Sequence, residues 1–115
     1  MIKQKQLSNT EVSAFCRQTA MIIKAGITPA EGMSILINDT IDTAGKDILK
    51  QIEDECLKGS RLYQAIEETN VFPKYVSKLI ALGEESGETD TVLNALADYY
   101  DREEDISDGI RSAFI

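Results

Sequence analysis

Along most of the chain, nonpolar residues recur at intervals of three and four positions, which is the spacing of one helix face. In the first stretch, the residues that form this stripe are Val12, Phe15, Cys16, Thr19, Ile22 and Ile23. We expect Thr10 to be the N-cap of this helix and Gly26 to end it, since glycine adopts the left-handed conformation that follows many helices. No stretch alternates with a period of two, so strands are not expected.

Two more helices are predicted between residues 28 and 58. In the first of them Thr28 is the expected N-cap, Pro29 occupies the first helical position, and Glu31 completes a capping box. This helix is expected to run to about residue 38. The next one begins near Asp42, and its expected inward residues are Ala44, Ile48, Ile52 and Cys56.

The remaining signals predict three helices with short connections. Gly59 ends the third helix, and Ser60 is expected to cap a short fourth helix with Leu62, Ala65 and Ile66 inward. Pro73 suits the first turn of a fifth, in which Val76, Leu79, Ile80 and Gly83 share a face. The last helix spans about residues 89–113 with the stripe Val92, Leu96, Tyr99, Ile106, Ile110 and Ala113. The predicted fold is therefore all-α, a compact bundle of about six antiparallel helices with short loops.

The amino-acid composition argues against several classes of function and partner. The chain has 115 residues, with 12 Lys and Arg against 20 Asp and Glu, a net charge of −8 and no histidine. This length favours one domain, and the acidic balance argues against nucleic acid or anionic lipid as partner. Without histidine, neither a Ser-His or Cys-His catalytic pair nor a His-bearing zinc site can form. We therefore expect a protein that is not an enzyme.

The cysteines and the hydropathy pattern suggest a soluble chain from a reducing compartment. Cys16 and Cys56 could form a disulfide, but two buried free thiols fit their apolar surroundings better. The polar residues 1–6 are not a signal peptide, because no apolar segment follows them. No run of about 18 apolar residues is present either, so no transmembrane segment is expected.

Two acidic segments could have a function. Residues 83–88 predict a tight corner in which Gly87 ends a helix and Ser86 or Thr89 caps the next one. The alternative is a calcium site, with oxygen ligands from Glu84, Glu85, Glu88 and Asp90, although the EF-hand spacing is absent. Residues 98–108 carry six acids and one arginine. They form either a solvated helix face or a docking strip for a basic partner, with one of Tyr99 and Tyr100 packed inward and the other half exposed.

A set of landmarks suggests a family. They are, in order, Phe15 with Arg17 and Gln18, residues 24–27 with Gly26, Gly59 with Ser60, Leu62 and Ala65, Phe72 with Pro73, and Gly83 with Glu84, Ser86 and Gly87. Their order and spacing resemble those of the type II secretion system protein F family, which includes the platform proteins of type IV and competence pili. The resemblance covers residues 7–115 and leaves residues 1–6 as a leader, disordered or added in cloning. One departure is Thr89, where the family usually has leucine.

The resemblance implies a non-enzymatic, six-helix cytoplasmic domain, usually present twice in a multi-pass protein of the bacterial inner membrane. Such a platform is thought to couple a hexameric ATPase to the insertion of pilin-like subunits. Arg17 and Gln18, or the acidic last helix, would face that ATPase. Residues 111–115 match the segment that leads into the family's first membrane helix, so the membrane would be reached only through segments outside this chain.

The resemblance requires no cofactor. Some family domains are reported to dimerise with calcium near their last two helices, which makes Glu84 and Glu88 candidate ligands and a homodimer a candidate assembly. A different class of function stays open on the residues alone, namely a stand-alone helical cation-binding or sensory protein-interaction module.

Overall fold

The computed structural model describes the backbone of residues 5–113 and the side chains of residues 5–104. In this part of the chain, six α-helices and no strands are present, which confirms the predicted all-α bundle. The helices are α1 (Asn9–Lys24), α2 (Pro29–Asp39), α3 (Thr43–Leu57), α4 (Leu62–Thr69), α5 (Lys74–Ser86) and α6 (Thr89–Ala113).

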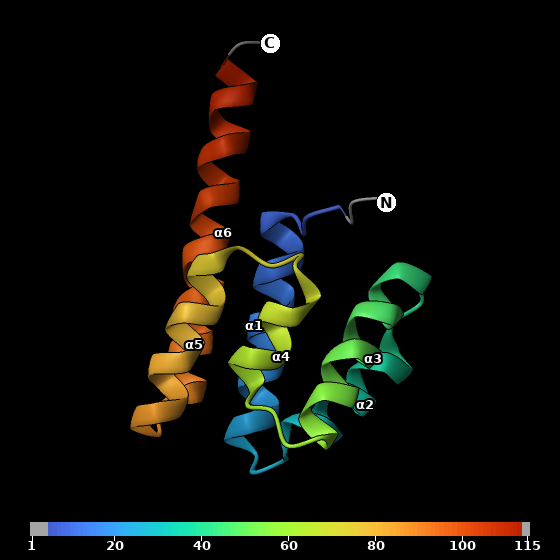
Figure 1. Cartoon of the computed structure of the whole chain (residues 1–115). Helices are drawn as coiled ribbons and strands as arrows, with labels where there is room; N and C mark the ends of the chain where they lie inside the picture. The colour runs from blue at the N-terminus through green and yellow to red at the C-terminus, as the bar shows by residue number, and fades with distance from the viewer. Residues whose placement is uncertain (1–4, 114–115) are drawn as a thin grey trace.

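Successive helices run antiparallel, and α6 extends past the rest of the bundle (Figure 1). The first and last helices pack most extensively on each other, α2 packs mainly on α3, and α4 and α5 bridge the two halves. The fully buried core includes Val12, Met33, Ile52, Ile66, Ile80 and Leu93. Every helix contributes one of these side chains, so a single core holds the domain together.

The N-caps of α1 and α4 differ from the sequence predictions, and the predicted capping box of α2 is incomplete. The N-cap of α1 is Ser8 and not Thr10, because Ser8 and Glu11 form a reciprocal capping box. At α2, Thr28 is the N-cap and Pro29 opens the helix as predicted, but among the described contacts only the hydroxyl half of the predicted box is present. The N-cap of α4 is Arg61 and not Ser60.

Two inward assignments are also wrong. Ala44 is exposed in the first turn of α3, whereas the predicted Ile48 is partly buried against the core beside the buried Leu49. On α6, Tyr100 is buried and Tyr99 is 37% exposed, because the buried stripe runs through Leu93, Leu96, Ala97 and Tyr100. One ring is thus buried and the other exposed, as expected, but the buried ring is that of Tyr100 and not that of Tyr99, which the predicted stripe contains. The predicted inward side chains of Ile106, Ile110 and Ala113 lie outside those described.

Glycines shape the connections. Gly26, Gly59 and Gly87, which were predicted to end helices, have positive φ angles of 82°, 104° and 75°. Gly32 acts differently: a Cβ there would lie 2.5 Å from Ile22 Cγ2. This close approach sets the beginning of α2 directly against the end of α1.

Candidate interaction surfaces

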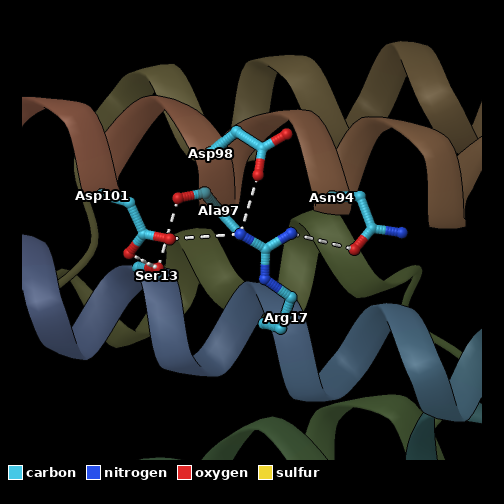
Figure 2. Close-up of polar contacts among 6 residues, drawn as sticks. All are labelled: Ser13, Arg17, Asn94, Ala97, Asp98 and Asp101. Carbon is cyan, nitrogen blue, oxygen red and sulfur yellow. Dashed lines mark hydrogen bonds and ion pairs between the residues drawn. The ribbon is translucent and has the colours of Figure 1, made fainter.

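An ion-pair network joins α1 to α6 (Figure 2). Arg17 Nη2 lies 2.8 Å from Asp98 Oδ1 and 3.1 Å from Asp101 Oδ2. Its other terminal nitrogen, Nη1, is 3.4 Å from Asn94 Oδ1. These three partners lie on successive turns of α6, so one guanidinium spans almost two turns of the antiparallel helix.

Ser13 extends the network by one helical turn. Its buried hydroxyl lies within hydrogen-bonding reach of the Asp101 carboxylate and 3.2 Å from the Ala97 carbonyl oxygen. The Ser13 hydrogen bond and the Arg17 guanidinium lower the pKa of Asp101 below its usual value, and the pKa of Arg17 is raised chiefly by its hydrogen bond to Asp98. The Asp101 carboxylate is therefore held as an anion against α1.

This geometry joins two surfaces that the sequence predicts as alternatives. Arg17 with Gln18 and the acidic last helix are predicted as separate candidate surfaces, but Arg17 binds the acids of that helix. Gln18 does not join the network and stays exposed. The contacts connect positions 77 to 88 residues apart in the sequence, so no local pattern could have predicted them.

Beside this network, α5 and α6 form an exposed aromatic surface. The rings of Tyr75 and Tyr99 have their centroids 5.3 Å apart and are 50% and 37% exposed. They border a hollow of about 140 Å³ together with Leu79, Val92, Ala95 and Leu96. On the inner side Tyr100 packs edge-to-face against Tyr99, and burial raises the pKa of Tyr100 to about 12. Exposed tyrosine rings are typical of a protein-binding surface.

The acidic corner has a structural role that the sequence did not reveal. The Glu84 carboxylate accepts hydrogen bonds from the backbone amides of Leu62, at 3.1 Å, and Tyr63, at 2.8 Å. From its position on α5, Glu84 thereby provides the hydrogen-bond acceptors for two backbone amides at the start of α4. The Ser86 hydroxyl donates to the Leu82 carbonyl oxygen within α5 at 2.9 Å, so it does not cap α6. Glu88 is exposed and accepts a hydrogen bond from Thr91.

Other residues that the sequence singles out contribute to core packing or to a helix start. Phe15 and Phe72 stack edge-to-face with centroids 4.9 Å apart, and Pro73 is the N-cap of α5. Gly83 is buried where a Cβ would lie 2.9 Å from Val92 Cγ2, so it lets α5 approach α6.

Both cysteines are free, with Cys16 buried and Cys56 half-buried, and burial raises the pKa of the Cys16 thiol to about 12. Within the described residues, no group of three or more His, Cys, Asp or Glu is arranged to hold a metal ion.

Fold and surface together define an all-α domain whose distinctive polar side chains lock α1 to α6 and whose exposed aromatic side chains lie on α5 and α6. Residues 15–115 match the family described as type II secretion system (T2SS), protein F. The chain is 30% identical over 103 residues to the type IV pilus assembly protein PilC of Thermus thermophilus, covering 90% of this chain and 25% of that protein. It is 30% identical over 89 residues to the type II secretion system protein F of Aeromonas hydrophila, covering 77% of this chain and 23% of that protein.

The chain belongs to the type II secretion system protein F family, the platform-protein family of type II secretion and type IV pilus assembly. It spans about a quarter of the length of these curated relatives. Across the part that the structure describes, no helix combines the length and the apolar character needed to cross a bilayer.

Proposed function

We propose that this chain is a non-enzymatic cytoplasmic domain of an inner-membrane platform protein, and that it couples the assembly ATPase to the insertion of pilin-like subunits. Family membership supports this proposal, and it favours a platform domain over a stand-alone cation-binding or sensory module. Within the proposal, the ATPase docks on the exposed side of α5 and α6, and α6 transmits the resulting displacement.

The observation that carries the proposal is the construction of α6. This helix has 25 residues, a length of about 37 Å at 1.5 Å per residue. One side of its first half is locked to α1 through Arg17, and its second half projects past the bundle (Figure 1). A helix whose first half is held against α1 and whose backbone continues past the bundle is suited to carry a movement of the domain along its axis.

The exposed side of α6 has the chemistry of a docking surface. Between residues 89 and 104 the helix carries one arginine and five acids, namely Asp90, Asp98, Asp101, Glu103 and Glu104. Glu103 lies one turn after Tyr99 on the same face of α6, and the Tyr75 and Tyr99 rings supply apolar contact area at little conformational cost. Such a surface favours a basic partner face, with fast association that weakens as salt rises.

Titration of the domain with its cognate ATPase at low salt tests the proposal. We expect Tyr75→Ala to weaken binding about tenfold, because a half-exposed aromatic anchor is removed from the surface while the fully buried core is unchanged. Glu103→Lys is expected to slow association, and Glu67→Lys on α4, an equal charge change on another face, is the matched control.

The proposal fails if neither this domain nor the complete cytoplasmic part of the platform protein binds the ATPase. It also fails in its choice of surface if Glu67→Lys weakens binding as much as Glu103→Lys. In that case the attraction would follow net charge and not a defined face.

A further inference from the structure

A second surface lies on the opposite side of α1. The first half of α1, the end of α2 and the beginning of α3 surround an open groove of about 280 Å³. Its apolar lining includes Leu7, Phe15, Leu36, Ile48, Leu49 and Phe72. The Gly32 and Ile22 contact fixes the other ends of α1 and α2 together, so the groove opens where these two helices no longer touch.

The charged groups of the groove are all acidic. Glu11 and Asp42 line it, and its lining contains no lysine or arginine. Both carboxylates are held in place by capping bonds: Glu11 accepts from the Ser8 amide at 2.8 Å, and Asp42 accepts from the Gly45 amide at 2.9 Å. Two fixed negative charges therefore border an apolar floor.

The turn at one end of the groove extends the apolar surface. Thr40 and Asp42 both line the groove, and Ile41 between them is 95% exposed. Burial of this isoleucine side chain against an apolar partner would gain the free energy of removing it from water. Gln18 and the small Ala14 lie on the α1 side, and both are exposed. This leaves room for another chain to lie across the groove.

We infer that the groove binds an amphipathic helix of a partner protein, with apolar side chains at positions i, i+3 or i+4 and lysine or arginine beside them. The apolar side chains fill the floor, and the basic ones pair with Glu11 and Asp42. A drug-sized ligand fits less well, since such sites span roughly 300 to 1,000 Å³ and are more enclosed. Anionic lipid and a second copy of this chain are both repelled by a net charge of −8.

Three synthetic helical peptides provide the test in NMR titrations of the domain. The first carries a leucine stripe with lysines beside it, the second has glutamates in place of the lysines, and the third has the first composition in shuffled order. We expect the first alone to bind and to shift the amides of Ala14, Gln18 and Ile48. Shifts centred on another face, or binding by none of the peptides, overturn the inference.

Charge variants that keep the helix caps sharpen the test. Glu11→Gln with Asp42→Asn removes both groove charges but retains residues that cap helices well, so the fold is preserved. We expect this pair to weaken peptide binding about tenfold. Glu31→Gln with Asp47→Asn makes the same charge change at exposed positions outside the groove, and it should change the affinity less than twofold.

Three results contradict the inference. Equal weakening by the two double variants would mean that the peptide follows net charge and not the groove. Unchanged affinity in Ala14→Arg, which places bulk and positive charge on the groove wall, would place the peptide elsewhere. Self-association of the domain in sedimentation runs, lost in Ala14→Arg, would make a second copy the occupant.

Discussion

Asp101 holds the α1–α6 contact at the level of single side chains. Its carboxylate accepts hydrogen bonds from the Ser13 hydroxyl and the Arg17 guanidinium, and Arg17 also forms an ion pair with Asp98. One arginine thus compensates two carboxylates on neighbouring turns of α6. Removing Arg17 would leave these like charges facing each other, so the network is more sensitive to loss of the cation than to loss of either acid.

The pKa of Asp101 gives the network a defined pH dependence. Because its folded-state pKa lies below the usual 3.8, the stability that Asp101 contributes is present above its unfolded-state pKa and is lost as pH falls through the folded value. We expect a carboxyl NMR titration to give Asp101 a pKa below 3.8 and Ser13→Ala to raise it, since the Ser13 hydrogen bond is its largest cause. An unchanged value in Ser13→Ala would contradict the assigned contact.

Thr19 is the opposite case, a buried polar atom without a partner. Its Oγ1 is fully buried and makes no hydrogen bond among the described residues. We expect Thr19→Val to raise the free energy of unfolding by about 1 kcal/mol, because the shape is kept and an unpaired hydroxyl is removed. Urea unfolding measures the change. Thr69→Val is the control, since the Thr69 hydroxyl donates to the Ile66 carbonyl oxygen at 2.7 Å and its loss should destabilise.

Between elements, Glu84 links the end of α5 to the beginning of α4. We expect Glu84→Ala to lower the free energy of unfolding by about 1 to 3 kcal/mol, because two α4 amides lose their acceptor. Glu85→Ala, at the next and exposed position, should stay within about 0.5 kcal/mol of the parent. Similar losses in both variants would show that Glu84 acts through general charge and not as a cap.

Calcium at this corner stays a prediction, and calorimetry on the parent and on Glu84→Gln tests it. Binding by the parent that Glu84→Gln lacks would support Glu84 as a ligand. Silent traces in both would show that calcium does not bind at this corner.

The elements themselves follow well from local sequence. Six helices, the glycine stops and the Thr28 and Pro29 start are predicted, because capping and periodicity act within a few residues. The errors arise where distant contacts decide. Tyr99 and Tyr100 both fit a helical stripe after Leu96, and packing against α1 selects Tyr100. Likewise Glu84 reaches the start of α4 from 21 and 22 residues away.

For the whole molecule, antiparallel pairing of the first and last helices determines the candidate surfaces. It brings Arg17 to the acids of α6 and leaves Tyr75 and Tyr99 exposed beside them, while the other side of α1 faces the groove. These juxtapositions depend on tertiary packing, so the sequence supplied their residue types but not their grouping. The domain thus presents two separate acidic surfaces, one with tyrosines on α5 and α6 and one with an apolar floor beside α2 and α3.

Hydrogen–deuterium exchange on the intact platform protein, alone and with its ATPase, locates the face that the ATPase contacts. Docking on α5 and α6 predicts that the ATPase slows exchange in residues 74–104, and that Tyr75→Ala reduces this protection. Residues 40–57 of α3 and its preceding turn should exchange as before. Protection confined to those residues, or no protection anywhere in the domain at saturating ATPase, would contradict the claim that this face receives the ATPase.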